Sequence, residues 1–267
     1  MIAFPDSWSE MPTDSDACDT TLVYVHGFGC ARVVWNGVAD ELARGFRQIL
    51  LDLPGHGPQG AMTYDLLRHR SLDGMAEHVA EVLTASDPER PGRTVLVGHS
   101  IGCNIAWRVA LAHPDKVSDL VLINASPCFR SLPGYRGGFA EEELRGMLDL
   151  MVHNPLQWSQ SLSGLVAGGS GAVACWLAES FCKVEPDCLR HFSEATFFVD
   201  DRELLRAIAQ PCLLLSNRRD SLVPLEVHRF MASAIRRNTE EVLDIAGHAA
   251  HMTHPFLVAE AMRRFLG

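Results

Sequence analysis

The sequence predicts an α/β fold in which helices cover both faces of a mostly parallel sheet. Short apolar runs recur along the chain, amphipathic stretches lie between them, and several runs lead directly into turns rich in glycine or proline. Continuous apolar runs are typical of strands that helices bury on both faces. With 267 residues and 47% hydrophobic composition, the chain is long enough to bury one large core.

The expected elements follow one another in the order that such a fold requires. Residues 1–20 are polar, contain Pro5 and Pro12, and show no strand alternation, so we expect a loosely ordered lead-in without a strand. The apolar runs predict strands near 22–25, 48–51, 95–97, 120–124, 212–216 and 241–245, and apolar periodicity predicts helices near 33–44, 71–85, 101–113 and 254–265.

The run 95–97 leads into Gly98-His99-Ser100-Ile101-Gly102, and an amphipathic stretch follows immediately. A strand, a sharp turn around Gly-x-Ser-x-Gly and a helix form a nucleophile elbow, which pushes the serine hydroxyl clear of the sheet. Glycine is needed at 98 and 102 because a side chain there would collide with the elbow backbone. The pentapeptide alone also occurs by chance, so the prediction of Ser100 as a nucleophile depends on the flanking strand and helix.

A long interval separates the strand near 120–124 from the strand near 212–216. A crossover needs far fewer residues, and the interval contains helical segments separated by glycine and proline. We therefore predict a four-helix lid at 133–197, inserted into a core formed by 1–132 and 198–267. The lid helices are expected near 140–153, 156–166, 172–182 and 186–199. Their many Leu, Met, Trp and Phe residues either pack among themselves or line an apolar chamber above Ser100.

A serine hydroxyl needs a base, a group that orients the base, and donors for the tetrahedral oxyanion. In an α/β-hydrolase these residues follow in the order Ser, Asp, His, each after a strand. Asp220 follows the run 212–216 and His248 follows the run 241–245, so we predict them as acid and base. The predicted oxyanion donors are the backbone N–H groups of Ile101 and of Phe28, which lies in a glycine loop after the first apolar run.

Other roles are open for some of these residues. Asp220 could instead begin the helix that follows Pro224, and His251 and His254 compete with His248 for the role of base. Histidines spaced by three residues can bind a metal ion, but no carboxylate or cysteine partner accompanies these in the sequence. We therefore expect neither a metal nor an organic cofactor.

Charge and composition indicate which binding partners and which cellular compartment to expect. The 23 basic and 33 acidic residues give a net charge of −10, which argues against binding nucleic acid or anionic membrane by bulk electrostatics. No stretch approaches the ~20 apolar residues of a membrane span, and the first twenty residues contain four aspartates and no basic segment. We expect a cytoplasmic protein whose eight cysteines are reduced and mostly buried, since none forms a Cys-x-x-Cys pair.

Several segments resemble the group of α/β-hydrolases that contains RsbQ and the strigolactone and karrikin receptors. The segments are His26-Gly27-Phe28-Gly29-Cys30, Gly98-His99-Ser100-Ile101-Gly102, Ser126-Pro127-Cys128-Phe129, Gly137-Gly138-Phe139, Asp200-Asp201-Arg202, and Gly247-His248 with His251-Met252-Thr253-His254-Pro255. The resemblance implies the triad Ser100, Asp220 and His248. It also implies a V-shaped lid of four helices over an apolar pocket to which Phe28, Phe129, Trp158 and Phe197 contribute. The segment 52–57 is closer to generic esterases than to RsbQ.

We expect a serine hydrolase of the carboxylesterase or lactonase type that acts on a small, largely apolar ester or lactone through an acyl-enzyme. The resemblance implies an alternative, a ligand sensor with slow turnover whose lid engages a signalling protein, such as a phosphatase with a PAS domain. A further alternative is a methyl ester esterase for acyl chains on a carrier protein, suggested by the segment 126–129 and the lid arginines Arg130, Arg136 and Arg145. Nothing in the sequence suggests a peptidase groove or a lipase's membrane-facing surface.

Overall fold

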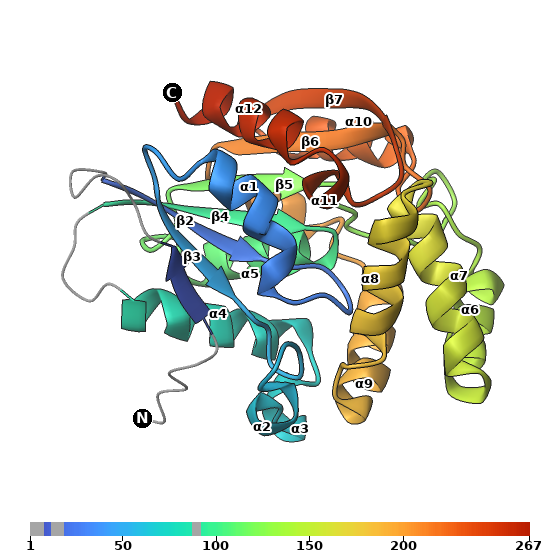
Figure 1. Ribbon diagram of the computed structural model, residues 1–267. Coiled ribbons are helices and arrows are strands. Elements are labelled where there is room, and N and C mark those ends of the chain that lie inside the picture. The colour runs from blue at the N-terminus through green and yellow to red at the C-terminus, as the bar shows by residue number, and fades with distance from the viewer. Residues whose placement is uncertain (1–7, 12–18, 87–91) are drawn as a thin grey trace.

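The computed structural model describes residues 8–11, 19–86 and 92–267 (Figure 1). Within these residues, seven strands form one sheet in the order β1-β3-β2-β4-β5-β6-β7. All neighbouring strands pair in parallel except β1 and β3. The expected α/β fold with a mostly parallel sheet is thereby confirmed. The strands are β1 (Trp8–Met11), β2 (Thr20–Val25), β3 (Arg47–Leu51), β4 (Arg93–His99), β5 (Asp119–Ile123), β6 (Cys212–Arg219) and β7 (Asn238–Ala246).

Strand β1 corrects the expectation that residues 1–20 contain no strand. It pairs antiparallel with the edge of β3, with Trp8 opposite Leu51 and Met11 opposite Gln48. The sequence did not reveal it because four residues are too few for a detectable alternation, and the free edge of β3 supplies the hydrogen-bonding partner. Pro5 and Pro12, on which the expected lead-in depended, lie outside the described residues.

The direction of each crossover decides which face a helix covers. The chain passes from β2 through α1 to β3 on one side of β2, and from β4 through α5 to β5 on the opposite side of β4. Right-handed crossovers therefore place α1 and α5 on opposite faces of the sheet. The core helices are α1 (Asn36–Glu41), α2 (Gly60–Thr63), α3 (Leu66–His69), α4 (Leu72–Ser86), α5 (Ile101–Ala112), α10 (Leu225–Ala234), α11 (Ala250–Thr253) and α12 (Pro255–Leu266), with 3-10 turns η1 (Arg32–Trp35) and η2 (Leu204–Ala207).

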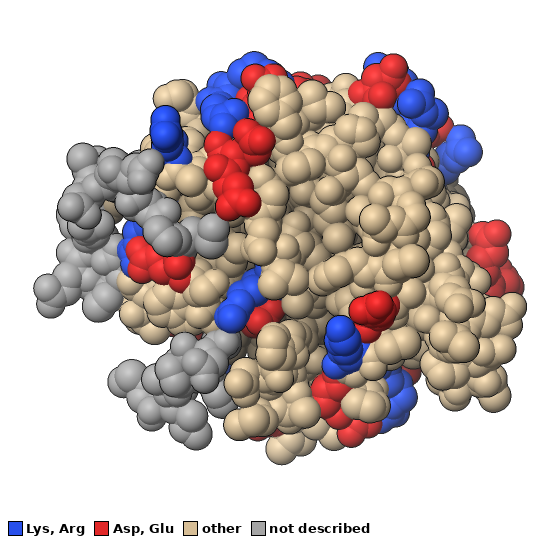
Figure 2. All heavy atoms as spheres, in the orientation of Figure 1, with Lys and Arg blue, Asp and Glu red and all other residues tan. Residues whose placement is uncertain are grey.

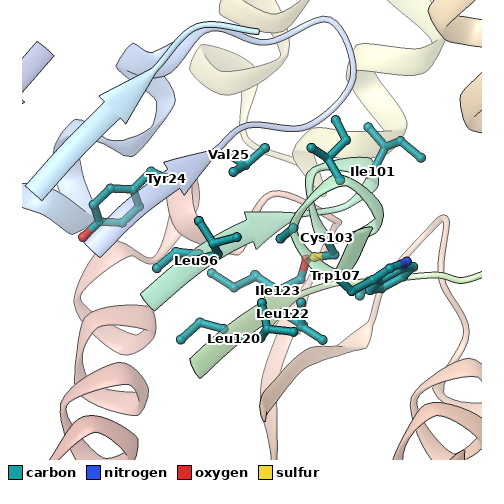
Figure 3. Packing of buried hydrophobic residues seen from close by; sticks show 14 of the residues in the cluster. Tyr24, Val25, Leu96, Ile101, Cys103, Trp107, Leu120, Leu122 and Ile123 are labelled. Atoms are coloured by element: carbon teal, nitrogen blue, oxygen red, sulfur yellow. Dashed lines mark hydrogen bonds between the residues drawn. The ribbon is translucent and has the colours of Figure 1, made fainter. Parts of the chain in front are cut away.

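Apolar side chains of β2, β4, β5 and α5 fill the core beside the elbow (Figure 3). Leu96, Leu120 and Trp107 are completely buried. Burying one such side chain contributes about 1.5–3 kcal/mol. This close-packed core fixes the carboxyl ends of the central strands, where the predicted site residues lie. Strands β2 and β4 are also neighbours from which the chain departs in opposite directions, and ligands of open α/β sheets bind at such a switch point.

The four helices expected between β5 and β6 are all observed. They are α6 (Glu141–His153), α7 (Pro155–Ala167), α8 (Gly171–Phe181) and α9 (Pro186–Phe197), and we call residues 133–197 the helical insertion. Asn154 accepts a hydrogen bond from the backbone of Gln157, which together with Pro155 begins α7. Gly168 ends α7 in the left-handed conformation. In Figure 1 the insertion extends from the sheet beyond the carboxyl ends of its strands.

The described surface carries charges of both signs. In Figure 2, most Lys and Arg side chains lie next to Asp and Glu side chains, and broad uncharged areas separate these groups. No helix in the described part of the chain is long and apolar enough to cross a membrane. Seven of the cysteines lie in that part and all are free thiols; five are buried, and Cys175 and Cys182 are exposed.

Candidate active site

Ser100 lies in the sharp turn between β4 and α5. Its φ of 54° is in the left-handed region, which a residue with a side chain adopts only under strain. A Cβ atom at Gly98 would lie 2.7 Å from the backbone nitrogen of Cys103, and one at Gly102 would lie 2.4 Å from the carbonyl oxygen of Val25. The structure therefore confirms that both positions require glycine, and it confirms the turn geometry of a nucleophile elbow.

His248 and Asp220 form a buried pair at the ends of β7 and β6. The Nδ1 atom of His248 lies 2.8 Å from Oδ2 of Asp220, and the two side chains are 2% and 1% exposed. Oδ1 of Asp220 accepts hydrogen bonds from the backbone N–H groups of Leu222 and Val223. Because the carboxylate accepts a hydrogen bond from the Nδ1–H group, the lone pair of the neutral imidazole is on Nε2. The alternative role of Asp220 is not observed, since Pro224 precedes the first residue of α10.

Asn124 holds the other oxygen of this carboxylate and was not identified from the sequence. Its Nδ2 donates a hydrogen bond of 2.5 Å to Oδ2 of Asp220. Asn124 follows β5 directly and has a φ of 50°, which asparagine tolerates better than most residues. The sequence signal was an asparagine at the end of a buried strand. Its role depends on β5 and β6 being neighbours, which the sequence did not establish.

The three histidines considered for the role of base occupy different environments. Nε2 of His248 is buried without a hydrogen-bond partner among the described residues, and His248 lines the same cavity as Ser100. His251 does not line this cavity; its ring packs against Trp35 at 4.6 Å and against His99 at 4.1 Å between centroids. Burial lowers the pKa of His251 to about 3, so it stays neutral. His254 is exposed and its Nδ1 contacts the Thr253 hydroxyl.

The predicted oxyanion donors come from two adjacent loops. Ile101 is the first residue of α5, where backbone N–H groups have no carbonyl one turn earlier in the helix. Phe28 lies in the loop after β2. The start of α5 contacts the beginning of this loop, since Gly102 packs against the carbonyl oxygens of Val25 and His26. His26 supports the loop: its Nε2 accepts a hydrogen bond from the backbone of Leu53, at 3.0 Å, and burial lowers its pKa to about 4.

A cavity of about 40 Å³ contains Ser100 and His248. It is lined by aromatic and aliphatic side chains of both the core and the insertion, with few polar atoms. The lining residues are Phe28, Cys30, His99, Ser100, Phe129, Leu162, Val166, Leu177, Phe181, Thr196, Phe197, Leu222 and His248. A larger open groove of about 440 Å³, between α4 and α9, contains none of the predicted catalytic residues.

Three of the four expected pocket residues line the cavity, and Trp158 does not. Phe28, Phe129 and Phe197 are cavity walls. Trp158 is 2% exposed and packs edge-on against Phe28, with 6.1 Å between ring centroids, and against Phe181 at 5.5 Å. It therefore supports two of the walls from behind. A single aromatic residue in a serine-rich helix could not reveal which of its neighbours would separate it from the cavity.

The end of α7 is hydrogen-bonded to the loop that carries His248. The backbone N–H of His248 donates to the carbonyl oxygen of Val166 at 2.8 Å, and the Ser221 hydroxyl donates to that of Leu165 at 2.6 Å. These carbonyls belong to the last turn of α7, where the regular helical hydrogen bonds end. Gly168 and Gly247 pack backbone against backbone, so a Cβ at Gly168 would lie 2.4 Å from Cα of Gly247. The helical insertion thus contacts the loops of both His248 and Asp220.

Helix α8 makes a corresponding contact with the loop of Phe28. The Ser180 hydroxyl donates a hydrogen bond of 2.6 Å to the carbonyl oxygen of Gly29. A Cβ at Gly29 would lie 2.2 Å from the ring of Phe181, so glycine is required for this approach. The hairpin of α7 and α8 therefore holds the loops on both sides of Ser100.

Among the described residues, no three His, Cys, Asp or Glu side chains are arranged to hold a metal ion. The arrangement is instead the one that nucleophilic serine chemistry needs. A strained elbow carries a hydroxyl, a buried carboxylate orients an imidazole, and the free nitrogen of that imidazole shares a cavity with the hydroxyl.

Comparisons with known proteins agree with this geometry. A family model described as the α/β-hydrolase fold matches residues 20–255. Karrikin insensitive 2 receptor CA of Petunia hybrida is 27% identical over 93% of this chain and 92% of its own length. The pimeloyl-[acyl-carrier protein] methyl ester esterase of Aeromonas hydrophila subsp. hydrophila is 30% identical over 92% and 95%.

The solved structure of a hydrolase from Oleispira antarctica superposes with a TM-score of 0.90 and 33% identity, covering 97% of this chain and 93% of the other. The resemblance to the receptor-like group is borne out by relatives that include receptors as well as esterases. The chain belongs to the α/β-hydrolase fold family, as an enzyme of the serine esterase type.

Proposed function

We propose that the protein hydrolyses a small, largely apolar ester or lactone through an acyl-enzyme on Ser100. The observation that carries the proposal is the buried pair of Asp220 and His248, whose free Nε2 shares a cavity with the strained Ser100. We also propose that residues 133–197 act as a lid over a core of 1–132 and 198–267, since four of their side chains in α7 and α8 line that cavity.

In the first half-reaction, the Ser100 oxygen attacks the ester carbonyl while Nε2 of His248 takes the hydroxyl proton. Asp220 holds the imidazole in the tautomer that can accept this proton and stabilises the imidazolium that forms. The negative charge on the carbonyl oxygen is stabilised by the N–H groups of Phe28 and Ile101. Collapse of the tetrahedral intermediate breaks the C–O bond to the alcohol, which takes the proton from His248 and leaves an acyl group on Ser100.

In the second half-reaction, water attacks the acyl-enzyme by the same route. His248 takes a proton from the water, the oxyanion forms at the same two N–H groups, and the Ser100 oxygen leaves with the proton. The net change is one ester and one water converted into an acid and an alcohol. No step requires a metal or an organic cofactor.

The size and the apolar lining of the cavity favour a substrate with a small, apolar acyl or lactone group. Its volume of about 40 Å³ is well below the roughly 300–1,000 Å³ of pockets for drug-sized ligands. Larger esters would have to displace residues of the insertion. A direct test is the hydrolysis of p-nitrophenyl acetate and butyrate: Ser100→Ala should lose several orders of magnitude in kcat and keep the thermal unfolding of the wild type. Turnover near that of the wild type would refute the proposal.

A ligand sensor is a second candidate, favoured by the small cavity and by the receptor among the relatives. A ligand that must move the insertion would change the surface of α6 to α9, to which a signalling protein could bind. A ligand can shift this equilibrium only through different affinities for the two states. Limited proteolysis with and without a slowly hydrolysed ester tests it: rapid turnover with no change in cleavage of 133–197 would reject the sensor.

Hydrolysis of a methyl ester on a carrier protein is a less favoured candidate. The relative from Aeromonas hydrophila supports it, but the three arginines that suggested it already have acidic partners. Arg130 and Arg145 contact Glu141, and Arg136 contacts Glu226 at 2.8 Å. This candidate is tested by comparing kcat/KM for an acyl-carrier-protein methyl ester with kcat/KM for the same methyl ester free of the carrier. Only an esterase that recognises the carrier protein should have a higher kcat/KM for the carrier-bound ester.

A further inference from the structure

Thr196 presents a buried hydroxyl to the cavity without a partner. It lies on α9 and is 2% exposed, and its Oγ1 has no hydrogen-bond partner among the described residues. Threonines in helices commonly donate to the carbonyl four residues earlier. Two other helical threonines of this chain make this hydrogen bond: the Thr84 hydroxyl donates to the carbonyl oxygen of Ala80 at 2.8 Å, and the Thr253 hydroxyl donates to that of Ala249 at 3.1 Å. Thr196 is the exception, and it faces the space that also contains Ser100.

The hydroxyl is the one polar group that the insertion contributes to the described cavity lining. The other lining residues of the insertion are Leu162, Val166, Leu177, Phe181 and Phe197. A buried hydroxyl without a partner costs about 1–3 kcal/mol, and valine has nearly the same shape without that cost. Packing alone therefore favours valine at this position, which indicates that the hydroxyl acts on something that occupies the cavity.

Among the described residues, the other side chains that line the cavity leave no strong hydrogen-bond donor free for a ligand; Nδ1 of His99 has no partner, but it is an acceptor because the proton of the neutral ring is on Nε2. Nε2 of His99 donates to the carbonyl oxygen of His248 at 2.9 Å. Ser100 and His248 take part in the proposed chemistry. Burial raises the pKa of Cys30 to about 12, so its thiol is neutral and only a weak donor. A second oxygen on a ligand in this cavity, which needs a donor, therefore has the Thr196 hydroxyl as the available strong donor among the described lining side chains.

We propose that Thr196 is a specificity-determining residue whose hydroxyl donates a hydrogen bond to a second oxygen of the substrate, separate from the ester group under attack. The inference rests on the proposed function and deepens it. The substrate class becomes small esters or lactones whose apolar skeleton carries one additional ether, hydroxyl or carbonyl oxygen. Ser100 and Thr196 line one cavity of about 40 Å³, so a molecule that fills it contacts both.

Two pairs of substrates that differ by one atom test the inference. p-Nitrophenyl methoxyacetate is p-nitrophenyl butyrate with a methylene replaced by oxygen, and 1,4-dioxan-2-one is related to δ-valerolactone in the same way. The measured quantity is the kcat/KM ratio of the oxygen-containing to the all-carbon member, compared between wild type and Thr196→Val. Differences in intrinsic reactivity within a pair cancel in this comparison. Thr196→Ser keeps the hydroxyl, and Thr84→Val removes one that lies outside the cavity.

The wild-type ratio should fall about 5- to 10-fold in Thr196→Val for at least one pair, as expected for the loss of one hydrogen bond. Thr196→Ser and Thr84→Val should keep the ratio within about twofold. Without ligand, Thr196→Val should unfold at the wild-type temperature or above, because it removes an unpaired hydroxyl. A lower unfolding temperature would mean that the hydroxyl is already paired, which would overturn the inference.

The inference and the proposed function fail differently. Ser100-dependent hydrolysis of both members of each pair, with ratios that Thr196→Val leaves unchanged, would refute the role of Thr196 and keep the esterase. Absence of Ser100-dependent hydrolysis would refute both. An equal loss of kcat/KM for both members would show that the substitution disturbs the cavity in general, and it would also overturn the inference.

Discussion

Gly168 ends α7 with a φ of 57° and packs against Gly247, the residue before His248. A Cβ added at Gly168 would lie 2.4 Å from Cα of Gly247 and 2.6 Å from the carbonyl oxygen of Ala246. Neither atom is the end of a flexible side chain, so the backbone itself must move. Gly168→Ala therefore pushes the loop of His248 away from α7. The backbone N–H of His248 donates a hydrogen bond to the carbonyl oxygen of Val166 in α7, and this bond is disturbed by the movement.

The size of the effect follows from this overlap. Cβ atoms in folded proteins essentially never lie closer than 3.0 Å to such neighbours, so the two backbones must separate by at least about 0.6 Å. Misplacing a catalytic group by about 1 Å can cost on the order of 100-fold in rate. We expect Gly168→Ala to lower kcat roughly 10- to 100-fold. Alanine in the left-handed region also costs about 1–2 kcal/mol of stability.

Gly169→Ala is the matched control. Gly169 has a φ of 99° in the same turn, but a Cβ there would meet no atom within 4 Å. It introduces backbone strain of the same kind without the overlap. Steady-state hydrolysis of p-nitrophenyl acetate, measured below the unfolding temperature of each variant, should give a low kcat for Gly168→Ala alone, with KM nearly unchanged. Equal kcat for the two variants would refute the idea that α7 positions His248.

Three further predictions concern the residues around the site. His251→Phe should keep most of the turnover because His251 packs between Trp35 and His99 without a hydrogen bond, whereas His248→Ala should lose it; the reverse result in ester assays would move the base by three residues. Asn124→Gly tolerates the φ of 50° and removes the donor to Asp220, so kcat should fall about 10-fold, and an unchanged kcat would contradict this role. Burial lowers the pKa of His26 to about 4 and those of His56 and His251 to about 3, so the unfolded chain binds more protons than the folded one below pH 6.5. The free energy of unfolding in urea should therefore fall as pH drops from 6.5 to 4, by up to about 1.4 kcal/mol per pH unit for each histidine, and His251→Phe should reduce this slope. Stability that stays flat over this range would contradict the buried, neutral state of these histidines.

The elements that the sequence predicted well are those with a local signature. Ser100 is surrounded by its own strand, glycines and helix within about ten residues, and the physical demand for glycine at 98 and 102 is local too. Three of the four insertion helices, α7, α8 and α9, begin close to their expected first residues because Asn154, Ser170 and Pro186 mark their starts. Asp220 and His248 followed from the order of residues after strands, which the fold class supplies.

The features that were missed depend on contacts between distant segments. Asn124 reaches Asp220 because β5 and β6 are neighbours in the sheet. Val166 accepts the N–H of His248 because the insertion folds back onto the end of β7. Trp158 was expected at the cavity, but Phe28 and Phe181 form the wall in front of it. None of these contacts leaves a periodicity or a motif in one sequence, since each is decided by tertiary packing.

The acyl-enzyme on Ser100 is the central claim, and mass spectrometry of the trapped intermediate tests it most directly. The enzyme is mixed with excess p-nitrophenyl butyrate, quenched in acid within the first turnovers, and digested. We predict one added butyryl group, located on the peptide that contains Ser100, which is absent in Ser100→Ala and strongly reduced in His248→Ala. A butyryl group on another residue, or rapid Ser100-independent turnover without any adduct on this peptide, would contradict the account.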